Sequence, residues 1–183
     1  MPNWCSNTLT LKHSDPVMIQ RARDAFMRGE LLQEFIPCPA ELLDTTAQFG
    51  ANEQEKANFE KHGYSSWYDW NIAHWGTKWD VGGDGCEAIT TANEISLSFE
   101  SAWAPPTNAY ERLMDQGFEV EAMYYEPGMA FAGHWDNGRD DYYEYGNMSA
   151  EEIAETLPTE LDEEFGISES VAEWESEQEE EEE

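Results

Sequence analysis

The block from Trp75 to Asp80 combines residue types that could contact another molecule. Lys78 is a rare positive charge in an acidic chain, and Trp75 and Trp79 flank it. Trp and Tyr are common in binding hot spots because they bury large areas at a low entropic cost. The block therefore predicts a partner-binding surface, to which we add Trp103. The alternative is that the indoles pack this segment onto a sheet while Lys78 and Asp80 form an internal ion pair.

Carboxylates form a second candidate surface, in residues 150–183. This segment holds 16 of the 40 acidic residues and no basic residue. Duplex DNA carries one charge per about 1.7 Å of its axis, and a dense array of ordered carboxylates can imitate that field. The segment therefore predicts contacts with a protein that otherwise binds DNA. The candidate residues here are Glu151, Glu152, Glu155, Asp162, Glu163 and Glu164.

Residues able to hold a metal or transfer a proton are present without a recognised pattern. The glycine-rich stretch Asp80–Gly85 lacks the alternating oxygen ligands and the final Glu of an EF-hand, so a glycine turn explains it better. His134 and neighbouring aspartates could meet Glu126 across a hairpin, but carboxylate pairs are frequent by chance in this chain. No nucleophile or phosphate-loop motif is found. We expect no catalytic residue, no metal and no cofactor, and we expect that the chain is not an enzyme.

The net charge restricts the classes of partner. The chain has 183 residues and a formal charge of −31, and its few basic residues are scattered. Such a field repels nucleic acids and anionic membranes, so we expect neither as a direct ligand. An aromatic content of 13% is too high for a wholly disordered chain.

The three cysteines, Cys5, Cys38 and Cys86, are widely spaced and odd in number. This pattern indicates buried free thiols and argues against a disulfide framework, a zinc site or an iron–sulfur cluster. The chain has no apolar run of membrane-spanning length, and its first residues do not resemble a signal peptide. We therefore expect a reducing cytoplasm as its compartment.

Hydrophobic periodicity and turn residues predict one α+β domain. Alternation predicts strands at residues 3–11, 95–101, 118–124, 129–135 and 141–145, with a strand or hairpin over 86–103. Helical spacing predicts helices that start at Ser14–Pro16 and Ala104–Thr107 and end at Gly29 and Gly117. Short helical pieces are expected within residues 31–61, and Gly63–Gly85 reads as irregular.

This order fits a ferredoxin-like fold. A split βαβ arrangement gives an antiparallel sheet with two helices on one face, here with a long Trp-rich insertion at about residues 30–85 and an extra C-terminal hairpin. We expect this domain to span residues 1–148. Residues 149–183 form an acidic tail, in which Ser149–Glu152 starts a helix, a short helix or two could dock, and the run Glu179–Glu183 is disordered.

Four groups of residues, in this order, resemble the Api-ninety-two-like ferredoxin-domain family of phage and plasmid proteins. They are Met1–Asn7, Tyr68–Trp70 with Trp75–Asp80, Phe99 with Ala102–Pro106, and Tyr125–Gly128 with Phe131–Gly133. The resemblance covers roughly residues 1–145 and implies a ferredoxin-like fold, but it carries over no catalytic residue. The acidic tail departs from the family pattern.

Charge and resemblance together predict an accessory binding protein encoded by a phage or plasmid. It would act in the host cytoplasm, with the virion as the alternative place, as a DNA mimic that inhibits a host nucleic-acid-binding or defence protein. The alternative is that the acidity only keeps a viral accessory or virion protein hydrated in a high-salt cytoplasm. The sequence leaves the partner and the oligomeric state open.

Overall fold

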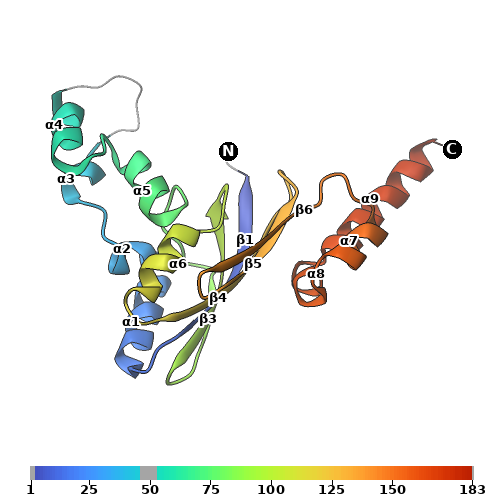
Figure 1. Ribbon diagram of the computed structural model, residues 1–183, viewed down its shortest axis with the longest axis horizontal. Coiled ribbons are helices and arrows are strands. Elements are labelled where there is room, and N and C mark those ends of the chain that lie inside the picture. The colour runs from blue at the N-terminus through green and yellow to red at the C-terminus, as the bar shows by residue number, and fades with distance from the viewer. Residues whose placement is uncertain (1–2, 46–52, 183) are drawn as a thin grey trace.

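An antiparallel sheet of six strands forms the centre of the protein (Figure 1). The computed structural model describes residues 3–45 and 53–182, with side chains up to Gln178. The strand order is β2-β3-β1-β4-β5-β6. The strands are β1 (Trp4–Lys12), β2 (Glu87–Thr90), β3 (Glu94–Ala102), β4 (Glu119–Glu126), β5 (Phe131–Asp136) and β6 (Arg139–Glu144).

The connectivity confirms the predicted α+β, ferredoxin-like class. Strands β1 to β4 alternate with α1 (Pro16–Met27) and α6 (Thr107–Met114) in the order β-α-β-β-α-β. β1 lies between β3 and β4, and β2 lies at the edge next to β3. The segment predicted as a strand or hairpin is the β2–β3 hairpin, and β5 and β6 form the predicted additional hairpin.

Alternating apolar residues turn one face of the sheet toward α1 and α6. Leu9 and Leu11 of β1 are buried, as are Ile95, Leu97 and Phe99 of β3, which confirms the alternation expected for β3. Helix α1 begins as predicted, because the Asp15 carboxylate accepts a hydrogen bond of 2.9 Å from the N–H of Val17. The main core therefore lies between this face and the helices that cover it.

The insertion between α1 and β2 is more regular than expected. It contains α2 (Leu31–Phe35), α3 (Ala40–Leu43), α4 (Glu53–His62) and α5 (Trp67–Trp75). The expectation of an irregular segment from Gly63 to Gly85 is wrong at α5. Trp67, Trp70 and Trp75 follow helical spacing, and Gly76 ends the helix in the left-handed conformation at φ +86°. Positions 46–52 of the expected helical region lie outside the described residues.

Residues 150–182 form three helices on the other face of the sheet (Figure 1). They are α7 (Ala150–Thr156), α8 (Thr159–Phe165) and α9 (Ile167–Glu182). Ser149 and Glu152 form a capping box at the start of α7, which confirms the predicted helix start. Disorder was expected over residues 179–183, but α9 continues to Glu182, because Glu readily extends a helix that has already formed; Glu183 lies outside the described residues.

A second apolar cluster joins these helices to the sheet. Its buried residues from the helices are Ile153, Leu157, Leu161 and Ile167, and those from the sheet side are Ala132 and Tyr145. The ring of Phe165 stacks on Tyr125 of β4, with 5.6 Å between ring centroids. Apolar burial of this kind holds the acidic helices in a defined place, since each fully buried aliphatic side chain contributes about 1.5–3 kcal/mol.

The three thiols differ in access to solvent. Cys5 and Cys38 are buried and free, as predicted, whereas Cys86 is partly exposed. Burial raises the pKa of Cys5 to about 12 and that of Cys38 to about 11. We therefore expect a thiol-specific reagent at pH 8 to modify Cys86 in the folded protein and the other two only after unfolding. Mass spectrometry follows the modification of each thiol. If all three thiols reacted at the same rate, the burial of Cys5 and Cys38 would be contradicted.

Candidate functional site

Three hydrogen bonds position the segment that follows α5. Gly76 turns the chain out of the helix, and its N–H donates to the carbonyl of Ile72. The hydroxyl of Thr77, which is fully buried, donates to the carbonyl of Ala102 at the end of β3 (3.0 Å). The side-chain amide of Asn71 donates to the carbonyl of Lys78 (2.9 Å). Lys78 is therefore held between α5 and the end of β3.

Two of the predicted site residues in this block point inward. Trp75 is buried, and its indole N–H donates to the carbonyl of Ile36 (2.9 Å). The Asp80 carboxylate accepts hydrogen bonds from the N–H groups of Leu32 (2.7 Å) and Gln33 (2.8 Å) at the start of α2, and also from its neighbour Val81. The alternative of an internal Lys78–Asp80 ion pair is therefore wrong. The Asp80 carboxylate instead accepts from the first N–H groups of α2.

Burial dominates the titration of Asp80. Loss of solvation raises the pKa of this carboxyl to about 6, although the three N–H donors act in the opposite direction. The nearby charge of Glu30 adds to the upward shift. Asp80 thus has a structural position, and its charge is costly at neutral pH.

Lys78 lies among three aromatic rings. Its Nζ atom is 4.4 Å from the ring centroid of Trp79, 5.2 Å from that of Trp103 and 5.7 Å from that of Tyr68. Trp4 adjoins the group, with 5.9 Å between its ring centroid and that of Trp79. We call these five residues the Lys78 cluster. Each ring within about 6 Å attracts the ammonium group, by about 0.5–1 kcal/mol at an exposed site.

The backbone of Trp103 is strained to place its ring here. Its φ of +69° is in the left-handed region, which costs a bulky residue of order 1–3 kcal/mol. The N–H of Trp103 donates to the carbonyl of Asn3 (2.9 Å), which ties the residue to the start of β1. The surrounding contacts thus offset the backbone strain at Trp103 and hold its exposed indole in one direction.

Tyr68 and Trp4 were not among the predicted site residues. Tyr68 lies on α5, and its ten-residue separation from Lys78 contains no repeat that links the two. Trp4 joins the cluster because β1 pairs with β3, which places Trp4 opposite Ala102 and beside Trp103. Only the strand register reveals this neighbourhood, although both residues lie in groups that carry the family resemblance.

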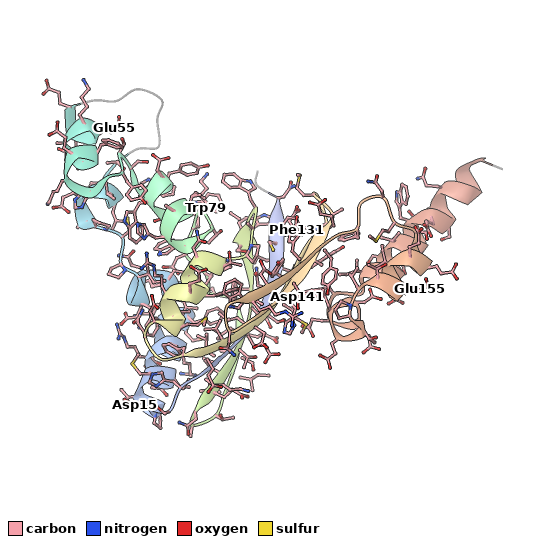
Figure 2. The ribbon with its side chains drawn as sticks, in the orientation of Figure 1. Asp15, Glu55, Trp79, Phe131, Asp141 and Glu155 are labelled. Carbon is pink, nitrogen blue, oxygen red and sulfur yellow. The ribbon has the colours of Figure 1, made fainter. Side chains whose placement is uncertain are left out.

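The acidic candidates divide into structural and exposed residues. Glu152 completes the capping box of α7, and Asp162 accepts two hydrogen bonds from Ser168, one from the N–H (2.7 Å) and one from the hydroxyl (2.6 Å). The remaining four are exposed carboxylates, namely Glu151, Glu155, Glu163 and Glu164. Figure 2 shows Glu155 and Trp79 on opposite sides of the sheet, so the two candidate surfaces are separate.

The alternative acid–base group is not assembled around a common point. His134 Nε2 lies 3.3 Å from Glu121 Oε1, whereas Glu126 is buried and accepts from the N–H groups of Gly128 and Met129. Among the side chains that the structure describes, in residues 3–45 and 53–178, no three from His, Cys, Asp or Glu gather in a way that could hold a metal ion. In the same described ranges, every helix is too short or too polar to cross a membrane.

Comparisons with known proteins return a structural likeness. No family model matches the chain. No curated protein matches it either. Among solved structures, the chain is similar to the crystal structure of a protein api92 from Yersinia pseudotuberculosis, of the family model DUF1281. The TM-score is 0.43 and the sequence identity is 13%, over 80% of this chain and 99% of that one.

Proposed function

We propose that this chain is a non-catalytic binding protein whose C-terminal helices present an acidic surface to a positively charged partner protein. The observation that carries the proposal is the apolar cluster of Ile153, Leu157, Leu161 and Ile167, which fixes α7, α8 and the start of α9 on the sheet. Carboxylates on a fixed support retain their spacing, whereas carboxylates on a flexible tail do not. A partner that binds DNA phosphates recognises such a spacing.

The density of charge in these helices approaches that of a nucleic-acid strand. Residues 150–182, which contain the three helices, carry 15 carboxylates, about one for every two residues. At a rise of 1.5 Å per residue, this is about one charge per 3 Å of helix axis. A single DNA strand carries one phosphate per about 3.4 Å. The similarity in linear density supports mimicry of DNA as the mode of binding.

The resemblance to phage and plasmid proteins suggests where such a protein would act. An accessory protein encoded by a mobile element would meet host proteins that bind its DNA, including restriction and other defence enzymes. A DNA mimic would occupy their cationic surfaces and so inhibit them. In this proposal the partner is a host DNA-binding protein, reached in the host cytoplasm.

The proposal is tested by competition on immobilised duplex DNA. DNA-binding proteins from a host lysate are loaded on the resin, and the protein is added as a competitor. Wild type is compared with Glu151→Gln/Glu155→Gln/Glu163→Gln/Glu164→Gln, in which four exposed carboxylates become amides. We expect the variant to release at least about tenfold less protein, since four contacts of a few tenths to 1 kcal/mol each are lost. Wild-type release should also fall steeply between about 50 and 200 mM salt.

A matched control separates position from net charge. The control changes Glu60, Glu87, Glu111 and Glu119 to Gln, which removes the same number of exposed charges from other elements. It should release as much protein as wild type. Equal losses in both variants would contradict a localised acidic surface. Deleting residues 150–183 is a poor test, because it would uncover Ala132 and Tyr145.

The alternative, in which acidity serves only solvation, is favoured by the spread of charge. Residues 1–149 keep the remaining −15 of the formal charge, so the excess is not confined to the C-terminal helices. A halophilic protein relies on salt to screen such repulsion. The test is to dialyse the wild type to about 10 mM salt and to follow its folding by circular dichroism. Unfolding at this salt concentration would favour the alternative over mimicry.

A further inference from the structure

The Lys78 cluster offers hydrogen-bond donors and ring faces on an exposed surface. Trp4, Trp79 and Trp103 are 46%, 39% and 39% exposed. Within the described residues, none of their three indole N–H groups has a hydrogen-bond acceptor, and Lys78 forms no ion pair. By contrast, the indole N–H groups of Trp67 and Trp75 donate to backbone carbonyls. The indole N–H groups of the cluster therefore lack the protein acceptors that those of Trp67 and Trp75 have.

The chemistry of the cluster defines what would fit it. An indole N–H donates only, and an ammonium group donates only, so a complementary ligand must supply acceptors. The ring faces favour apolar or C–H-rich surfaces. One cation calls for one anionic group, and the negative field of a chain with a formal charge of −31 disfavours a polyanion such as a nucleic acid.

An extended, proline-containing peptide has these properties. Its carbonyl groups point outward as acceptors, and its proline rings present C–H faces without N–H groups that would need acceptors. Surfaces rich in aromatic side chains bind such segments because the polyproline II conformation is already ordered before binding. A carboxylate in the segment would pair with Lys78.

We propose that the Lys78 cluster binds an extended proline-containing segment of a partner protein that carries a single carboxylate. This site goes beyond the acidic surface of α7 to α9, because Trp79 and Glu155 lie on opposite sides of the sheet (Figure 2) and the cluster selects the opposite charge. The strained Trp103 and the hydrogen bonds of Thr77 and Asn71 hold the rings in place before binding. A fixed surface of this kind loses little conformational entropy when a ligand binds.

The probe is an acetylated and amidated proline nonamer with a central glutamate. Nuclear magnetic resonance of the indole N–H groups follows the titration, with signals assigned from single Trp variants. We expect saturable shifts of the Trp4, Trp79 and Trp103 signals. Replacing the glutamate of the peptide by glutamine should weaken binding about tenfold, the effect of losing a charge-assisted hydrogen bond. Lys78→Met, which retains an unbranched side chain of similar length, should cause the same loss.

Variants in a cycle identify the contact. Lys78→Met with the glutamine peptide should bind no more weakly than either single change, since both remove the same pair. Trp79→Ala should abolish the saturable shifts, whereas Trp174→Ala, at an exposed indole on α9, should leave them unchanged. Thermal unfolding of each variant checks that it is folded.

Three outcomes would overturn the proposal. The first is no saturable shift of these indoles with the glutamate peptide at millimolar concentration. The second is equal affinity for the glutamate and glutamine peptides. The third is saturable binding of an acidic oligosaccharide or a nucleoside monophosphate that exceeds peptide binding. None of these outcomes bears on the competition experiment with DNA-binding proteins, because the four glutamates exchanged there lie on α7 and α8.

Discussion

Replacing Gly82 by alanine is expected to cost more than about 3 kcal/mol of folding stability or to prevent folding. Gly82 has a φ of +102°, which L side chains rarely adopt. A Cβ atom there would fall on the carbonyl oxygen of Phe26 and lie 2.8 Å from Cδ2 of its ring. That carbonyl also accepts hydrogen bonds from Gly29 (2.9 Å) and Gly83 (2.7 Å), so it cannot move without breaking the end of α1.

Two neighbouring glycines provide matched controls for this prediction. Gly83 and Gly85 also have positive φ, at +95° and +88°, but a Cβ at Gly83 would meet only Gly29, at 3.6 Å and beyond, and one at Gly85 would meet nothing within 4 Å. Their alanine variants should lose only about 1–2 kcal/mol, from the left-handed backbone alone. Urea unfolding measures all three. Equal losses at the three positions would show that the contact with Phe26 does not limit stability.

Replacing Asp80 by asparagine is expected to destabilise the protein by about 1–3 kcal/mol at pH 5, because the amide turns an NH2 group, which cannot accept, toward one of the three backbone N–H groups that face Asp80. The N–H groups of Leu32 and Gln33 begin α2, so the loss should loosen this helix first. Asp84→Asn, at an exposed carboxylate of the same loop, is the control and should lie within about 0.5 kcal/mol of wild type.

The cost of Asp80→Asn should depend on pH in a defined direction. The folded-state pKa of about 6 exceeds the unfolded value of 3.8, so the folded protein binds this proton more tightly. The resulting stability is complete below about pH 4 and is lost as pH rises through 6. Asparagine does not titrate, so the cost of the substitution should be about 1.4 kcal/mol larger at pH 5 than at pH 7. A cost that grows toward pH 7 would mean that the N–H donors outweigh burial.

Local sequence patterns predicted much of the framework. The alternation of Ile95, Leu97 and Phe99 and the cap at Asp15 were read correctly because strand pleat and helix capping depend on residues close in sequence. The sequence does not predict helix α5, because glycines and clustered tryptophans also indicate irregular structure. The spacing of Trp67, Trp70 and Trp75 was helical all the same.

The candidate sites could be predicted only in part. The Trp75–Asp80 block was recognised as distinctive, but its residues face different directions: Trp75 and Asp80 pack inward, while Lys78 and Trp79 lie in the exposed cluster. Side-chain direction in a turn after a helix depends on what the neighbouring backbone can bond. Here Trp75 turns inward to the carbonyl of Ile36, and Asp80 turns inward to the start of α2; both partners are distant in sequence.

The sequence by itself determined the acidity of the chain, its α+β class, and the position of the two unusual segments. These properties follow from composition and from patterns within a few residues. Only the tertiary structure placed Trp103 beside Lys78 and Trp4 beside Trp79, and only it placed the acidic helices on the sheet through Ile153, Leu161 and their neighbours. Such contacts join residues far apart in the chain, and their geometry depends on strand register and packing, which no local pattern encodes.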